Sequence, residues 1–296
     1  MRGALTLMSG CLYVVATPIG NLEDVTRRAV NVLSSVAIIA AEDTRRTATL
    51  LAHCGVGGAK LVALHDHNET RVGQSLLAAL RAGRDVALVS DAGTPLVSDP
   101  GFELVRDCWA EQIPVVPVPG ASAVSAAISV CPLPVGRYRF EGFLPAKAQA
   151  RQLRLEALCA APEASVFFEA PHRIESSLKA LSALAPARRL MIGRELTKTH
   201  EHLLCGTADE LLGTLREKHA IRGEFVCVLE ANRDPDPGHP SPEVERALRA
   251  LVKELPPSKA ARLAAEMYGG SRSDYYDRAV ALTAADKPPK PRGRDG

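Results

Sequence analysis

Between residues 11 and 132 the chain alternates short apolar runs with segments of helical periodicity. The runs are hydrophobic at every position rather than at every second one, which is typical of strands covered on both faces. They occupy residues 12–16, 36–40, 61–64, 86–90 and 114–118. Strands that alternate with helices in this way predict an α/β domain built on a mostly parallel sheet.

Two helical patterns between these runs are clear. One places four apolar residues on a single face, at intervals of three or four positions: Val25, Ala29, Val32 and Val36. The other is expected to begin after Asn68, whose side chain suits an N-cap, and to stop at Gly83.

The pattern changes after residues 131–136, which contain two prolines and a glycine and are interpreted as a hinge. Strands are predicted at 137–143, 165–170, 188–196, 202–207 and 224–231, and helices near 148–160, 172–184 and 208–218. The strands at 188–196 and 202–207 follow each other directly, so they must pair antiparallel. Residues 133–232 are therefore predicted to form a second, mixed α/β domain.

The remaining residues have a different character. Residues 233–241 are rich in proline and aspartate and are predicted to be a linker. Residues 242–284 predict a small helical extension, and residues 285–296 predict a disordered tail.

Composition restricts the class of protein. The 296 residues carry a net charge of only +2, so any RNA contact requires a local basic patch. The seven cysteines include no C-x-x-C pair, which favours reduced thiols and a cytoplasmic location. The segment LMSGC at 7–11 has the form of a lipoprotein cleavage site, but the apolar stretch before it is too short for a signal sequence. No apolar run approaches the roughly 20 residues of a membrane-spanning helix.

The loops that follow the predicted strands hold much of the glycine, proline and acidic residues of the first domain. They lie at 17–21, 41–46, 65–69, 91–101 and 119–123. The carboxyl ends of parallel strands share one edge of the sheet, and ligands of open α/β sheets bind there. This edge is therefore the predicted site.

The longest of these loops, DAGTPLVSDPG, suits a cationic ligand that bears an amino group. It contains two glycines that permit close approach, two prolines that leave carbonyls unpaired, and two carboxylates: Gly93, Gly101, Pro95, Pro100, Asp91 and Asp99. A tight turn packed between the domains explains the same residues equally well. The fingerprints of a Rossmann dinucleotide site and of a P-loop are absent from the sequence.

Three further patterns have both a functional and an ordinary structural interpretation. The pairs His65/His67 and His200/His202 lack the third ligand that a zinc site needs, so no metal is predicted. The charged residues within 167–174 and 193–201 could act on a ligand or form ion pairs. The stretch 137–154 is a local basic patch, in which Lys147, Arg151 and Arg154 are candidate phosphate contacts.

Eight segments, in order along the chain, resemble one known family. They are ATPIGNLEDVTRRA, AEDTRRT, SDAGTPLVSDPG, VPGASA, GFLPAK, FFEAPHRI, GRELTKTHE and RGEFV. Together they resemble the tetrapyrrole methylase-like, class III S-adenosylmethionine (SAM) methyltransferases, in the branch that methylates small-subunit ribosomal RNA. The resemblance covers about 12–231, and residues 242–282 resemble the helical extension of that branch.

The resemblance implies two α/β domains with SAM in the cleft between them, a homodimer, and no need for a metal or a nicotinamide. It also implies methylation of the ribose 2′-hydroxyl of a cytidine in the decoding centre of 16S rRNA. The SAM contacts that it implies are Pro18, Ile19, Asp91, Gly93, Thr94, Pro95, Val97, Gly120, Ala121, Ser122, Phe168, Gly193 and Phe225. Thr94 stands where relatives with other substrates have aspartate, so Asp91 is expected to supply the carboxylate for the SAM amino group.

A ribose hydroxyl is weakly acidic, so a general base would help its attack. The candidates are Glu42, Asp43 and Asp99, with Asp43 favoured because it lies at the predicted cleft edge beside Arg45. Capping of the next helix is an equally good interpretation of Asp43. The candidate substrate contacts are Arg45, His67, Asn68, Lys147, Arg151 and Arg154.

Three alternatives remain open from the sequence. The first is a methylase of a small tetrapyrrole-like substrate, which the missing aspartate and the basic stretch disfavour. The second is a non-catalytic RNA-binding protein with a relic SAM site, which would bind no SAM. The third is a metal-dependent hydrolase.

Overall fold

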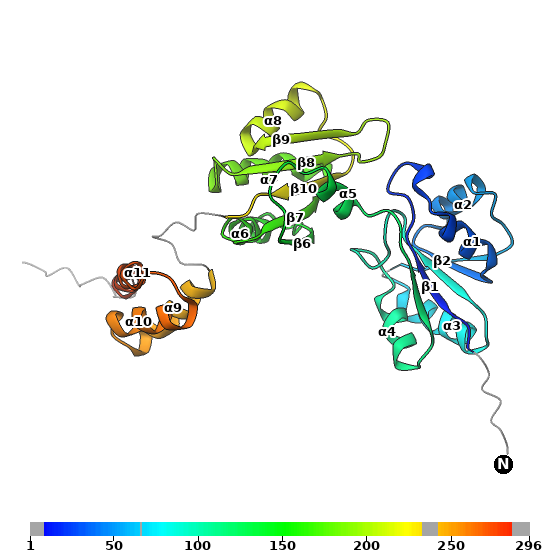
Figure 1. Ribbon diagram of the computed structural model, residues 1–296, viewed down its shortest axis with the longest axis horizontal. Coiled ribbons are helices and arrows are strands. Elements are labelled where there is room, and N and C mark those ends of the chain that lie inside the picture. Colours follow the sequence, from blue (N-terminus) through cyan, green and yellow to red (C-terminus); the bar gives the residue numbers. More distant parts are fainter. Residues whose placement is uncertain (1–8, 66, 233–241, 286–296) are drawn as a thin grey trace, which may run out of the picture.

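The computed structural model describes residues 9–65, 67–232 and 242–285 (Figure 1). The predicted linker at 233–241 lies outside the described residues. So do residues 286–296 of the predicted tail and the first two residues of the LMSGC segment.

The first domain is built on a five-stranded sheet of order β3-β2-β4-β1-β5, in which every pairing is parallel. Its strands are β1 (Leu12–Val15), β2 (Ile38–Ala41), β3 (Lys60–Ala63), β4 (Val86–Val89) and β5 (Val115–Val118). The predicted strands and the predicted parallel sheet are confirmed.

Helices cover both faces of this sheet. They are α1 (Arg27–Ser35), α2 (Thr44–His53), α3 (Glu69–Arg81) and α4 (Phe102–Ala110), preceded by the short 3-10 helix η1 (Leu22–Asp24). Ile38 packs in the cluster that includes α3 and α4, whereas its neighbour Ile39 packs in the cluster with α1 and α2. Adjacent strand residues are thus buried on opposite faces, which explains the continuous apolar runs.

The helix α3 begins after Asn68, as predicted, but the expected capping bond is not formed. The Asn68 side chain turns back instead, accepting from the backbone N–H of His65 at 3.0 Å and donating to the carbonyl of Ala63 at 3.1 Å. Asn68 therefore stabilises the loop before the helix rather than the helix itself.

The second domain contains a mixed sheet of order β6-β7-β10-β8-β9. Its strands are β6 (Tyr138–Phe143), β7 (Ala164–Glu169), β8 (Arg189–Arg194), β9 (His202–Thr207) and β10 (Phe225–Leu229). Only β6 and β7 are parallel in it, and β8 and β9 form the predicted antiparallel pair. One face is covered by α6 (Ala148–Cys159), α7 (Pro171–Leu184) and α8 (Ala208–Glu217).

The other face of this sheet is covered by α5 (Ala123–Ser129), which precedes the predicted hinge. Val124 and Ala127 of α5 are buried in one cluster with Val166, Met191 and Val226 of the second sheet. The predicted boundary at residues 132 and 133 therefore cuts between α5 and the core on which this helix packs.

The predicted extension consists of α9 (Pro242–Glu254), α10 (Pro257–Tyr268) and α11 (Arg272–Ala285). These helices share a small core that includes Leu248, Ala264 and Ala279. In Figure 1 they stand apart from both sheets. Within the described parts of the chain, no helix is both long enough and apolar enough to cross a membrane.

Candidate active site

A cavity of about 400 Å³ lies between the two domains, in the size range of small-molecule sites. The first domain contributes the loop after β4 together with Ile19, Glu42 and Arg46. The second domain contributes the ends of β7, β8 and β10. The predicted edge of the first sheet thus forms one wall of the cavity.

The loop at 91–101 is held in place at both ends. The backbone N–H groups of Thr17 and Gly93 each donate to the other's carbonyl, at 2.8 and 3.0 Å. At the far end the Glu69 carboxylate accepts from the N–H of Gly101 at 3.0 Å and from that of Glu103 at 2.9 Å. The loop is therefore shaped before any ligand arrives.

Two residues of this loop, Leu96 and Ser98, have left-handed φ values of +71° and +77°. Such values are uncommon for residues other than glycine, asparagine and aspartate, and they cluster at functional sites. The strain is consistent with a loop shaped for a ligand.

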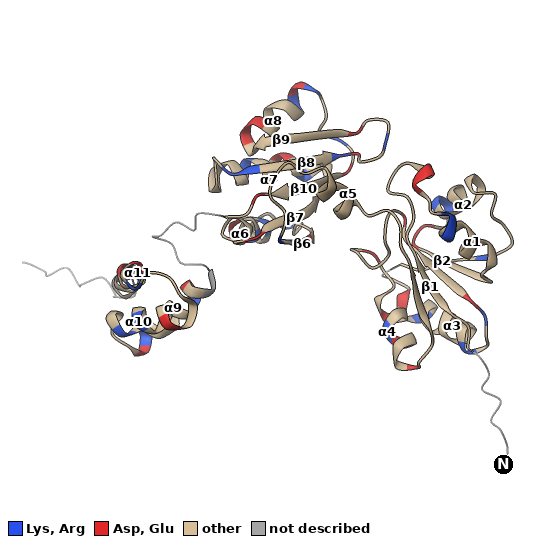
Figure 2. Ribbon diagram, viewed as in Figure 1, with Lys and Arg blue, Asp and Glu red and all other residues tan. Residues whose placement is uncertain are grey.

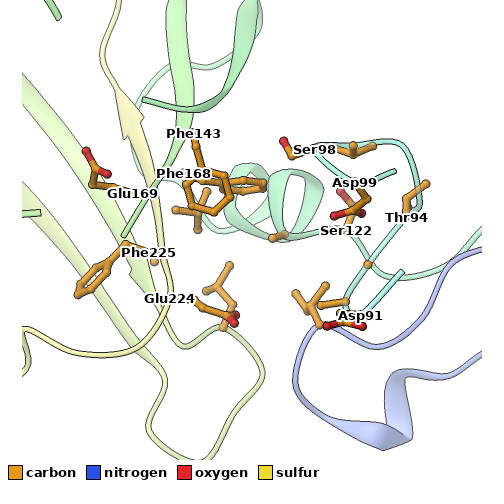
Figure 3. Close-up of a pocket in the computed structure, with 18 of the residues that line it drawn as sticks. Asp91, Thr94, Ser98, Asp99, Ser122, Phe143, Phe168, Glu169, Glu224 and Phe225 are labelled. Atoms are coloured by element: carbon orange, nitrogen blue, oxygen red, sulfur yellow. The ribbon is translucent and has the colours of Figure 1, made fainter. Parts of the chain in front are cut away.

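Three carboxylates gather on the first-domain side of the cavity. Glu42, Asp91 and Asp99 all line it, and Figure 3 shows Asp91 and Asp99 on the wall opposite the aromatic side chains. Asp91 accepts from the N–H of Asp43 at 2.9 Å, and its own N–H donates to Glu42 at 3.3 Å. Backbone contacts at the strand ends thus fix Asp91 and Glu42, and the three carboxylates together favour a cationic ligand.

The pKa of the Asp99 carboxyl is raised to about 6, mainly by burial and also by the neighbouring charges of Glu42 and Asp91, while a hydrogen bond from Ser90 opposes them. A carboxyl in this range can take up a proton near neutral pH. Asp99 therefore has the properties expected of a general base in the cavity.

Aromatic side chains form the second-domain wall. The Phe168 ring lies edge-to-face with Phe140 at 5.0 Å and with Phe143 at 5.4 Å, measured between ring centroids. A register shift in β6 between Phe140 and Phe143 brings Phe143 to the cavity, where its side chain stays more than half exposed. Phe225 also borders the cavity, but its ring is buried in the core beneath α6–α8 and points away from the cavity in Figure 3. This wall suits a flat, apolar group.

Most of the predicted cofactor contacts line this cavity: Ile19, Asp91, Gly93, Thr94, Val97, Ser122, Phe168, Gly193 and Phe225. Pro18 lines a neighbouring cavity. The other three, Pro95, Gly120 and Ala121, are among the lining residues of neither. Ala121 instead supports the loop, because its carbonyl accepts from Thr94 Oγ1 at 3.3 Å. A Cβ on Gly120 would lie 3.0 Å from that of Ala16, so glycine permits the close packing of β1 against this turn.

Sequence reasoning missed several lining residues, among them Arg46, Ser98, Phe143, Leu196 and Glu224. Arg46 follows the predicted Arg45 in the AEDTRRT segment, and Glu224 precedes the predicted Phe225 in the RGEFV segment. Each could have been identified from the predicted residue beside it. Phe143 follows Gly142, whose φ of +65° lies within the register shift of β6, and a glycine inside a predicted strand is the usual sequence signal of such a bulge.

Asp43, the favoured base, does not line the cavity. Its carboxylate caps α2 by accepting from the N–H of Arg45 at 2.8 Å, and it also pairs with the Arg45 guanidinium. These hydrogen bonds lower the pKa of Asp43 to about 2, which makes it a weak proton acceptor. The structure thus supports the capping interpretation of this residue.

The predicted substrate contacts are scattered. Arg45 and Lys147 are exposed, and so is His67, but none of them lines either cavity. Arg154 is paired with Glu141. Arg151 is buried, and it donates to the carbonyls of Pro145 and Ala146 and to Ser176. In this structure Arg151 is therefore a structural residue and not a phosphate contact.

The charged residues of the FFEAPHRI segment form a buried network. The Glu169 carboxylate accepts from Arg173 Nε at 2.8 Å, from Ser177 Oγ at 2.6 Å and from the N–H of Ala170 at 2.9 Å. Although Glu169 borders the cavity, these partners occupy its oxygens, so we assign it a structural role. In the GRELTKTHE segment, Lys198 similarly pairs with Glu195 and Glu224.

No group of three or more histidine, cysteine or acidic side chains suited to a metal ion occurs in the ranges that the structure describes. His65 and His67 approach edge-to-face, with ring centroids 6.1 Å apart.

Comparison with known proteins gives the family. Residues 11–212 match the model of the Tetrapyrrole (Corrin/Porphyrin) Methylases, and residues 238–283 match the RsmI C-terminal HTH domain. The chain is 46% identical over 273 residues to ribosomal RNA small subunit methyltransferase I of Escherichia coli O157:H7, covering 92% of this chain and 95% of that protein. It is 47% identical over 270 residues to the enzyme of the same name from Xylella fastidiosa strain Temecula1, covering 90% and 98%.

The fold is shared with solved structures of much lower sequence identity. Uroporphyrin-III C-methyltransferase from Thermus thermophilus, solved in complex with S-adenosyl homocysteine, matches with a TM-score of 0.52 at 19% identity. The match covers 75% of this chain and 97% of that one. The chain thus belongs to the tetrapyrrole methylase family and, within it, to the ribosomal RNA small subunit methyltransferase I family.

Proposed function

We propose that this protein transfers a methyl group from SAM to the ribose 2′-hydroxyl of a cytidine in the decoding centre of 16S rRNA, at position 1402. The names of the similar proteins support small-subunit ribosomal RNA as the substrate. The main structural support for this reaction is the cavity between the domains, which has carboxylates of the first domain on one wall and aromatic rings of the second domain on the other.

The residues of the cavity fit SAM on chemical grounds. SAM has an ammonium and a sulfonium at one end and an adenine ring at the other, and when bound it supplies an activated methyl group. Asp91, with Gly93 and Thr94 beside it, would hold the amino-acid end. Phe168 would pack against the adenosine, and Gly193 and Phe225 border the same part of the cavity.

Asp99 acts as the general base in this proposal. Its carboxylate lies in the cavity and has a pKa of about 6, so it is ionised at pH 7 yet is a better proton acceptor than an ordinary aspartate. It would accept the hydroxyl proton as the ribose oxygen attacks the methyl carbon, whose bond to the sulfonium sulfur would break and leave S-adenosylhomocysteine. Glu42 keeps the pKa of Asp99 raised through its charge.

The protein's assembly completes the proposal. We propose that it works in the cytoplasm, where its substrate would be, and that α9–α11 add contacts to the small subunit, because this region matches a helix-turn-helix model.

We also propose a homodimer. Phe102 and Trp109 are 67% and 72% exposed, and they lie seven residues apart on one face of α4, which suits a subunit interface.

A tritiated-methyl transfer assay tests the function directly. Small subunits from cells that lack this enzyme would be incubated with SAM, and the labelled nucleotide would be mapped. Label on one ribose 2′-oxygen of a decoding-centre cytidine is expected. If SAM binds but neither subunits nor free 16S rRNA accept label, the RNA substrate is refuted and a small tetrapyrrole-like substrate becomes the leading candidate. If SAM does not bind, the catalytic assignment fails.

The base is tested in the same assay with two isosteric variants. We expect Asp99→Asn to lower kcat by about 10²–10⁴-fold, which is the usual contribution of general base catalysis. Asp43→Asn keeps kcat within about threefold, because Asp43 does not reach the cavity. The reverse order of effects would return the role to Asp43.

A further inference from the structure

A second cavity, of about 270 Å³, adjoins the first. It is lined by the loop after β1, by the first turns of α2 and, from the second domain, by Lys198 and Glu224. The two cavities share five lining residues: Ile19, Arg46, Asp91, Ala92 and Glu224. A ligand in the second cavity would therefore lie beside whatever occupies the first.

The cations of this second cavity differ in how firmly they are held. Lys198 Nζ lies 2.9 Å from Glu195 and 3.0 Å from Glu224, and its side chain is only 29% exposed. Arg46 Nη1 lies 3.4 Å from Asp91 Oδ2, beyond the usual 2.7–2.9 Å of a charge-assisted bond, and its side chain is 65% exposed. Arg46 is thus the more readily recruited of the two.

Arg46 is also linked to the first cavity through Asp91. The Asp91 carboxylate has one oxygen on the N–H of Asp43 and the other facing Arg46. A cation that enters the first cavity and engages Asp91 competes with the Arg46 guanidinium for the same charge. Arg46 is then free to bind an anion in the second cavity.

The anion that best fits is a phosphate of an RNA strand. A planar guanidinium matches a phosphate in two parallel hydrogen bonds. Exposed arginines at the starts of α1 and α2, namely Arg27, Arg28 and Arg45, extend the basic surface away from the cavity. Figure 2 shows basic segments at the starts of these helices, and both basic and acidic residues on the β8–β9 loop across from them. An extended polyanion can contact such a surface, whereas a single small anion cannot span it.

We propose that the second cavity holds RNA next to the target nucleotide, with Arg46 on a phosphate, and that cofactor binding releases Arg46 from Asp91 and so tightens RNA binding. This inference rests on the proposed function, because it takes RNA as the substrate. The coupling is reciprocal, since the RNA must strengthen cofactor binding by the same factor.

The experiment measures the Kd of unmethylated small subunits without turnover, with and without saturating S-adenosylhomocysteine, over a range of salt concentrations. Three variants are compared with the wild type: Arg46→Ala, Arg46→Lys and Arg106→Ala. Arg106 is a matched control, because it is a 54% exposed arginine on α4 that is paired with Asp107 and lines neither cavity. Titration calorimetry gives the affinity of each free protein for S-adenosylhomocysteine.

For the wild type we expect S-adenosylhomocysteine to tighten subunit binding about fivefold. Arg46→Ala abolishes this coupling and reduces the slope of log K against log salt by about one, the value for one phosphate contact. Arg46→Lys keeps the slope and part of the coupling, because it keeps the charge. Arg106→Ala behaves as the wild type.

Two results overturn the inference. In the first, the wild type binds and methylates subunits, and Arg46→Ala shows the same coupling and salt slope as the wild type. The inference then fails while the proposed function stands. The other is a large loss of S-adenosylhomocysteine affinity in free Arg46→Ala without change in RNA binding, which would make Arg46 a cofactor contact. If wild-type protein neither binds nor methylates RNA, the proposed function itself fails.

Discussion

Replacement of Asp99 by asparagine is expected to stabilise the protein while it removes activity. The pKa of Asp99 rises from 3.8 to about 6 on folding, so the folded protein favours the protonated carboxyl. The stability that belongs to this group is fully present below pH ~4 and is lost as the pH rises through about 6. An asparagine of the same shape carries no charge and escapes this loss.

The size of the effect follows from the pKa change. About two units at 1.36 kcal/mol each amount to about 3 kcal/mol, and solvent around this half-buried side chain reduces the figure to about 1 kcal/mol. For a protein of this size that corresponds to a rise in Tm of about 2–4 °C. The expected Tm difference between Asp99→Asn and wild type is therefore about 2–4 °C at pH 8 and close to zero at pH 4.

Differential scanning calorimetry at pH 4, 6 and 8 measures this difference. The control is Asp43→Asn, for which the sign is opposite. The pKa of Asp43 is lowered on folding, so its stabilisation is present above pH ~4 and is lost as the pH falls through about 2. This control should lower Tm at pH 8. A Tm gain for Asp99→Asn that is the same at all three pH values, or a Tm loss at pH 8, would refute the reasoning from desolvation.

Three other substitutions test the remaining assignments. Arg151→Ala should lower the free energy of unfolding by about 2 kcal/mol in denaturant unfolding, because two backbone carbonyls lose a charged donor. The control Lys147→Ala, at an exposed position, should show no such loss. Gly93→Ala should weaken SAM binding about tenfold in calorimetry, because φ at this position is +83° and a Cβ would lie 3.3 Å from Ile19. The control Gly57→Ala, at a position with open space around it, should bind SAM as the wild type does. Phe168→Leu should weaken SAM binding about five- to tenfold through loss of aromatic contact, and unchanged affinity would remove Phe168 from the adenosine wall.

The strands of both domains could be predicted from the sequence because each is a local apolar run, and local patterns report burial directly. The placement of α5 could not be predicted, because its apolar residues show only that the helix is covered. Which sheet covers it depends on strands far along the chain.

In the candidate site, too, local features could be predicted from the sequence and features that depend on distant residues could not. The loop at 91–101 could be recognised from its glycines and prolines, which are local signals. Among the three candidate carboxylates the sequence favours Asp43, whereas the cavity lining and the raised pKa favour Asp99, because a pKa depends on burial and on charges from other strands. Similarly, Arg45 and Arg46 are adjacent in the sequence, and only the orientation of the first turn of α2 turns Arg46 towards the cavities.

The position of α5 has a consequence for how the chain matures during synthesis. All five strands of the first sheet have been made once Val118 is reached, but the partners of α5 lie in β7, β8 and β10, the last of which ends at Leu229. At typical translation rates, about 100 residues take about 5–20 s to emerge. For that time the apolar face of α5 has no sheet to cover. A nascent chain of this protein should therefore present a short-lived binding site for chaperones, which disappears when β10 docks.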